Sequence, residues 1–131
     1  MIFIDASLPK TVADELKKVR DDVVFKHDVF LPGTDDPIWL RRVGVEGWLA
    51  ITRDVRIRTR PGEREAIMEN GVGCFILTHQ KDLPTPEVVR IVFDHLPGME
   101  RRFSSTPRPF IYTVTKNGHF TEYAQRRLRG S

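Results

Sequence analysis

The chain of 131 residues carries 21 Lys and Arg against 18 Asp and Glu, and its hydrophobic content of 40% is typical of a globular protein. This length and balance predict one domain with one core and exclude a disordered chain. No apolar run approaches the roughly 18 residues needed to span a bilayer, and the N-terminus lacks the basic region and cleavage site of a signal peptide. We therefore expect a cytoplasmic protein without a membrane partner.

The first part of the chain predicts three strands separated by two helices. An apolar strand at Ile2–Ile4 precedes a helix capped by Ser7, whose apolar face repeats at helical spacing. A second strand at Val23–Phe25 leads through a loop to a helix capped by Asp36. The third strand, over 48–52, is apolar on both faces, as in the centre of a parallel sheet.

The second part continues this alternation. A helix over 61–70 is followed by an apolar strand over 74–78, which contains the single cysteine in an environment typical of a buried, inert thiol. Thr85 caps a fourth helix, and Pro97 with Gly98 is expected to stop it. The Asn-Gly pair at 117–118 then predicts a C-terminal β-hairpin with strands over 110–115 and 119–123.

This order of elements predicts an α/β fold, a three-layer α/β/α sandwich with a mainly parallel central sheet and an added C-terminal hairpin. We expect a single domain over residues 1–123. The remaining residues, 124–131, form a basic segment with little to bury, and we expect them to be mobile.

Acidic residues follow the predicted strands. Asp5 follows the first strand, Asp54 follows the third, and Asp36 begins a helix at the same edge of the sheet. Because parallel strands end at one edge, the three carboxylates are expected to converge there and to need a compensating cation. Oxygen ligands suit Mg²⁺ or Mn²⁺. Each aspartate could instead serve only as a cap or close a turn.

Other polar residues surround the predicted edge. Arg56, Arg58 and Arg60 alternate just beyond Asp54 and could bind phosphate, although an exposed basic loop explains them too. Glu65, or one of the three aspartates, could orient or deprotonate a water molecule. His27 and His79 also fall at strand ends, and we interpret them as polar edge residues. The absence of a cysteine partner or a His-x-x-x-His spacing argues against zinc.

Three segments carry a resemblance to a known family. Residues 2–9, 33–40 and 47–57 resemble the three acidic motifs of PIN-like domains, and the compact toxins of VapC-type toxin–antitoxin pairs are the most similar subgroup. The resemblance implies a PIN-like fold, Mg²⁺ or Mn²⁺ dependence and endoribonuclease activity, with Asp5, Asp36 and Asp54 at the acidic positions. For a further acid, Glu65 and Asp28 are alternatives, and Asp35 could replace Asp36.

The sequence therefore supports a metal-dependent ribonuclease that cleaves RNA phosphodiesters with metal-activated water. The resemblance also implies neutralisation by a small antitoxin protein, and the aromatic hairpin is a plausible contact surface for a homodimer. The alternative is a non-catalytic PIN-like module that binds RNA or protein. A small phosphohydrolase is disfavoured, because Asp5-Ala6-Ser7 does not supply the Asp-x-Asp step of an aspartyl nucleophile.

Overall fold

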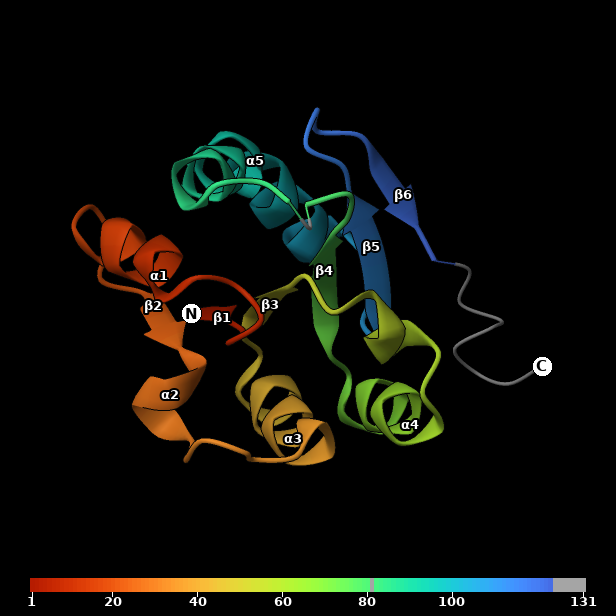
Figure 1. The fold of residues 1–131 in the computed structure, drawn as a ribbon. Helices are drawn as coiled ribbons and strands as arrows, with labels where there is room; N and C mark the ends of the chain where they lie inside the picture. The colour runs from red at the N-terminus through yellow and green to blue at the C-terminus, as the bar shows by residue number, and fades with distance from the viewer. Residues whose placement is uncertain (81, 124–131) are drawn as a thin grey trace.

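The computed structural model describes residues 1–80 and 82–123, which form a layer of helices on each face of a six-stranded sheet (Figure 1). The sheet order is β2-β1-β3-β4-β5-β6, with all neighbours parallel except the antiparallel pair β5–β6. The strands are β1 (Ile2–Ile4), β2 (Val23–Phe25), β3 (Leu49–Thr52), β4 (Gly73–Leu77), β5 (Phe110–Val114) and β6 (Phe120–Glu122). The α/β/α prediction and its C-terminal hairpin are confirmed.

The helices form two layers. They are α1 (Lys10–Lys17), α2 (Lys26–Val29), α3 (Asp36–Glu46), α4 (Pro61–Asn70) and α5 (Thr85–Ser105), with a short 3₁₀ turn, η1 (Val55–Arg58), after β3. Figure 1 shows α1 and α5 on one side of the sheet and α3 and α4 on the other. Parallel strands need such crossover helices, and the helices in turn bury both faces of the sheet.

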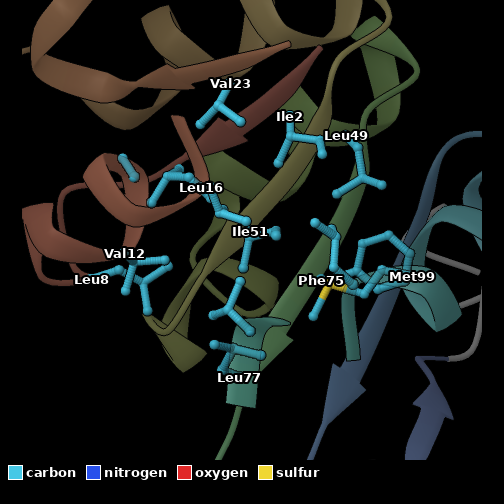
Figure 2. Close-up of a cluster of buried hydrophobic side chains, with 14 of the residues drawn as sticks. Ile2, Leu8, Val12, Leu16, Val23, Leu49, Ile51, Phe75, Leu77 and Met99 are labelled. Atoms are coloured by element: carbon cyan, nitrogen blue, oxygen red, sulfur yellow. The ribbon is translucent and has the colours of Figure 1, made fainter. Parts of the chain in front are cut away.

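Two hydrophobic clusters separate the layers. In the first, Leu8, Val12 and Leu16 from the α1 region face sheet residues such as Ile51, and Met99 of α5 closes the same cluster (Figure 2). The second cluster lies under α3 and α4. Its members include both tryptophans, buried as expected, and Cys74, whose pKa is raised by burial so that the thiol stays protonated.

Four predicted helix ends were wrong, three starts and one stop. Ser7 does not cap α1, which begins after Pro9, because the Ser7 Oγ accepts from the backbone N–H of Arg53 at 3.1 Å rather than from an N–H of the helix. Asp36 and Thr85 are the first residues of their helices rather than the caps. In α5 the chain stays helical through Pro97 to Ser105, because Leu96 and Met99 bury apolar surface on both sides of the exposed proline and offset its lost hydrogen bond.

Within the part of the chain that the structure describes, no helix is both long and apolar enough to cross a membrane. The basic segment predicted to be mobile, residues 124–131, lies outside the described residues.

Candidate active site

The sheet topology brings the predicted acidic positions to one edge. β1 and β3 are adjacent and parallel, with Ile4 opposite Ile51, so the residues that follow them emerge side by side. β1 also pairs with β2 on its other side, which makes the β1–β3 boundary a point where the connections run in opposite directions along the sheet. Open α/β sheets bind ligands outside the carboxyl ends of their strands at such a point.

Asp5 is buried at this edge, with 6% of its surface exposed. Its Oδ2 accepts hydrogen bonds from the hydroxyls of Ser7 at 2.6 Å and Thr52 at 2.7 Å. The Thr52 hydroxyl in turn accepts from the backbone N–H of Asp54 at 3.1 Å. A single hydroxyl therefore connects the carboxylate that follows β1 with the backbone that follows β3, and it fixes their relative positions.

Asp36 and Asp54 meet at one guanidinium. Arg60 Nη1 donates to Asp36 Oδ2 at 3.1 Å, and Arg60 Nη2 donates to Asp54 Oδ2 at 2.8 Å. Nη1 also donates to Glu63 Oε1 at 2.8 Å. The hydrogen bond to Glu63, together with the negative charge of Asp54, raises the pKa of Arg60. With Arg56, whose Nε lies 3.8 Å from Asp54 Oδ1, three acids and two cations thus form a cluster with one negative charge in excess.

The hydrophobic core positions Asp36. Trp39 is fully buried, and its ring stacks on Phe3 of β1 with the centroids 5.1 Å apart. The Trp39 Nε1–H donates to Asp36 Oδ1 at 2.7 Å, one turn earlier in α3. The stacked Phe3 and Trp39 rings therefore hold the Asp36 carboxylate in a fixed orientation. Asp36 is thus more than the first residue of α3.

The other predicted site residues lie around this cluster. Glu65 is exposed on α4, whereas Glu63, which the sequence interpretation did not select, contacts Arg60. The i, i+3 spacing of Arg60 and Glu63 was the available signal. Arg56 is exposed, with Nε 3.8 Å from Asp54 Oδ1. The Arg58 guanidinium lies over the Tyr123 ring.

Asp28 and Asp35, the alternative candidates for the acidic positions, make different contacts. Asp28 accepts from Lys17 and from the backbone N–H of Phe25, and these contacts outweigh desolvation and lower its pKa. Asp35 is the exposed residue before α3. Of the two edge histidines, His27 packs edge-on against the Phe25 ring, and His79 follows β4 in the left-handed backbone region. The catalytic and metal roles of all these residues stay predictions.

Two hollows adjoin the acidic cluster. One, of about 440 Å³, is lined by the loop before α3 and by Asp36, Arg60 and Glu63. The other, of about 350 Å³, is lined by residues from the ends of β3 and β4. Asp54 contacts Arg60, which lines the first hollow, and its two neighbours in sequence, Arg53 and Val55, line the second.

Comparison with known proteins identifies the family. A family model described as a PIN like domain matches residues 1–79, which is more than half of the chain. The chain belongs to the PIN-like domain family. This PIN-like match includes Asp5, Asp36, Asp54 and Arg60, and it places the chain in a family of nuclease fold. Neither the curated proteins nor the solved structures gave a match.

PIN domains typically use divalent metals. The acidic residues at this edge can therefore be compared with the ligands that such an ion needs. The donor chemistry fits, because carboxylate oxygens are the ligands that Mg²⁺ and Mn²⁺ prefer. The arrangement does not yet fit: among the residues described, no three His, Cys, Asp or Glu side chains are grouped so as to hold a metal ion. Asp36 and Asp54 point at Arg60, and Asp5 is engaged by two hydroxyls.

Proposed function

We propose that this PIN-like protein is an Mg²⁺- or Mn²⁺-dependent endoribonuclease, the toxin of a toxin–antitoxin pair. The observation that supports it most is the shared guanidinium: Asp36 and Asp54, far apart in sequence, aim their carboxylates at one small volume. A structural ion pair needs one acid for one arginine. Here three acids face Arg60 and the more distant, exposed Arg56, which leaves one negative charge in excess and favours a further cation.

In this proposal each residue of the chain has a distinct task. Asp36 and Asp54 would hold the ion together with Asp5, and Glu63 replaces Glu65 as our candidate for the acid that orients water. A bound divalent ion would offset the charge of the phosphodiester and favour ionisation of a water molecule. Arg56 and Arg58 would bind flanking phosphates.

Arg60 has to release the acids before a divalent ion can bind. Its side chain is 34% exposed, so it can turn outward without opening the core. An outward guanidinium would then be available to an RNA phosphate at the same edge. Arg60 would thus keep the substrate-binding role expected of it, while serving as the counter-ion of the acids when no metal is bound.

The proposed partners follow from the same assignment. RNA is the substrate, and a small antitoxin protein would neutralise the enzyme. The hairpin β5–β6 carries Tyr112 and Phe120, which are half-buried, and is our candidate for a homodimer contact. We also propose a cytoplasmic location.

A non-catalytic RNA-binding module is the second candidate. It is favoured by the same ion pairs, because Arg60 already neutralises part of the acidic cluster and no metal-binding group of three is formed within residues 1–80 and 82–123. Such a module would bind RNA in a salt-dependent manner without cleaving it.

One experiment separates the two candidates. Single-stranded RNA is incubated with the protein and Mn²⁺, and with Asp5→Asn as the test variant. Asp14→Asn, an exposed change on α1, is the matched control. The nuclease proposal expects cleavage by the wild type and by Asp14→Asn, and loss of at least about 100-fold in rate for a folded Asp5→Asn. Salt-sensitive binding with no cleavage by any of the three proteins would support the binding module.

A further inference from the structure

Arg53, the residue after β3, is fixed in position without being neutralised. It is half-buried, and its Nε donates to the Ser7 carbonyl oxygen at 2.6 Å, while its backbone N–H donates to Ser7 Oγ at 3.1 Å. No carboxylate of the described residues pairs with its guanidinium, and its two Nη groups have no acceptor among them. A side chain that is already held loses little rotamer entropy when it binds a ligand.

The arginines that follow Arg53 in sequence are in a different situation. Arg60 pairs with three acids, and Arg58 lies over an aromatic ring. The Arg56 side chain is 77% exposed and lies 3.8 Å from an Asp54 oxygen, so it is neither held nor free of a negative charge. Of these four guanidinium groups, that of Arg53 alone is both anchored and without an acid partner within residues 1–80 and 82–123. Its charge is therefore available to an anion from outside the chain.

Arg53 lines the hollow of about 350 Å³ at the ends of β3 and β4, together with Val55, Leu77, His79 and Gln80. None of these five residues is acidic, so a metal cation is disfavoured. The Gln80 amide atoms are buried and offer no contact to a ligand. Val55 and Leu77 give the hollow apolar walls, which strengthen the field of a cation in a concave site. The lining therefore favours an anionic ligand.

His79 supplies a second donor to this hollow. Its side chain is exposed, and an imidazole carries at least one N–H, for which the described part of the chain provides no acceptor. The His79 backbone has φ of +58°, a region that non-glycine residues seldom adopt. Unusual backbone of this kind is retained preferentially at binding and catalytic sites. The turn after β4 thus keeps a histidine where a glycine would suit the backbone better.

We propose that this hollow binds a backbone phosphate of RNA, with Arg53 as a bidentate donor and His79 as the second donor. The parallel N–H bonds of a guanidinium match two phosphate oxygens, and ribose carbon atoms can pack on the apolar walls. The proposal rests on the proposed RNA substrate and deepens it, because it locates one phosphate relative to the acidic edge. Ser7 is the connection: it accepts from the Arg53 guanidinium through its carbonyl oxygen and donates to Asp5 through its hydroxyl.

The first test measures RNA binding without divalent ions, so that binding is separated from cleavage. A short oligouridylate is titrated into the full chain at several salt concentrations, with Arg53→Gln as the test variant and Arg101→Gln, exposed on α5, as the control. Arg53→Gln is expected to bind at least about fivefold more weakly and to reduce the slope of log K against log salt by about 0.7, the share of one phosphate contact. Equal losses in the two variants would mean that only the overall charge matters, and would overturn the proposal.

The second test needs no variant, so it holds even if Arg53→Gln fails to fold. NMR follows the Arg53 Nε–H signal of the wild type as the oligouridylate, inorganic phosphate or uridine is added. The oligouridylate is expected to shift this signal, inorganic phosphate to shift it at higher concentration, and uridine to leave it unchanged. A shift with inorganic phosphate but not with RNA would identify a free-phosphate site instead. That result, an equal shift with uridine, or no shift at all would overturn the RNA subsite.

His79→Gly distinguishes a ligand-binding role of the histidine from a structural one. Glycine adopts a positive φ without strain, so the variant is expected to be at least as stable to urea as the wild type. It also removes the imidazole, and oligouridylate binding should weaken about threefold. A His79→Gly protein that binds the oligouridylate as tightly as the wild type does would contradict a subsite with two donors.

These results are independent of RNA cleavage. If RNA binds through Arg53 but stays intact with Mn²⁺, the nuclease proposal fails and the phosphate subsite stands. If RNA is cleaved but Arg53→Gln changes neither the affinity nor its salt dependence, the subsite fails and the nuclease stands.

Discussion

Nη2 of Arg60 lies 2.8 Å from Oδ2 of Asp54, so the acid that follows the central strand β3 is paired with a cation from its own chain. This pair bridges six positions in sequence and spans the 3₁₀ turn η1. It gives the acidic edge a form that is stable without metal, and it makes cation binding a competition between a guanidinium and a divalent ion.

Replacing Arg60 with alanine tests that competition. Three carboxylates lose their common partner, so the metal-free protein is expected to lose about 1 kcal/mol of stability, the order found for partly exposed ion pairs. Mn²⁺ should then raise the Tm of Arg60→Ala more than that of the wild type, because binding to the folded state alone stabilises it. Arg64→Ala, one turn further along the chain and inside α4, is the matched control. Equal Mn²⁺ effects on all three proteins would contradict the competition.

Thr52 offers a test of how Asp5 is held. Thr52→Val removes a buried hydroxyl that donates to the Asp5 carboxylate and is expected to cost about 1–3 kcal/mol, since a buried charge loses a donor. Thr52→Ser keeps the hydroxyl and should cost less, about 1 kcal/mol for the lost methyl group. Urea unfolding measures both. A valine variant as stable as the serine variant would show that the hydroxyl does not support Asp5.

Two glycines should respond in opposite directions to the same substitution. A Cβ on Gly44 of α3 would clash with the Asn70 carbonyl oxygen of α4, so Gly44→Ala has to push the two helices apart. We expect a loss of about 1–3 kcal/mol, as for an overpacked core. At Gly62 the nearest atom would be Pro37 Cγ at 3.8 Å, an ordinary contact, and Gly62→Ala should gain up to about 1 kcal/mol from helix propensity. Thermal unfolding of both variants provides the comparison, and a stable Gly44→Ala would refute the close approach.

The pH dependence of stability should reveal the ion pair between Arg20 and Asp22. The hydrogen bond from Arg20 lowers the pKa of Asp22 below its ordinary 3.8. A carboxyl with a lowered folded-state pKa stabilises the fold above its unfolded pKa, and this contribution is lost as the pH falls through the folded value. The stability advantage of the wild type over Arg20→Gln should therefore be full at pH values well above 3.8 and shrink as the pH falls below that value.

Glu100 is the second partner of Arg20, so the same variant also releases α5 from the end of α1. Arg101→Gln, exposed on α5, is the control and should show a difference that does not depend on pH. A wild-type advantage that grows on acidification would contradict the assignment to Asp22.

The sequence was informative where one local rule decides the outcome. Short apolar runs predicted β1 and β2 at the residues where they occur, and parallel topology then predicted that Asp5 and Asp54 share an edge. Helix ends were harder, because a hydroxyl can have several partners. Ser7 looked like a cap, but its Oγ accepts from the backbone N–H of Arg53 after β3, while its hydroxyl donates to Asp5.

The parts of the site that the sequence did not reveal depend on packing between distant elements. Arg60 reaches Asp36 across 24 positions only because α4 packs against α3, and no spacing rule announces that contact. The sequence places both Glu63 and Glu65 shortly after the arginines, and Glu65 was selected. Which of the two faces Arg60 depends on how α4 is oriented about its own axis, and the structure places Glu63 there. The sequence did not predict that Gln80 is buried with both atoms of its side-chain amide unpaired among the described residues, because burial and pairing depend on the folded surroundings.

The family match ends at His79, but the first hydrophobic cluster does not. Val92, Leu96 and Met99 of α5 and Phe110 of β5 cover Phe75 on the face of the sheet that α1 leaves open. A chain cut after residue 79 would keep the acidic motifs yet expose one side of its central strands to water. The stretch that matches the family is therefore shorter than the stretch that buries the first hydrophobic cluster, and an expression fragment designed from the match alone should aggregate.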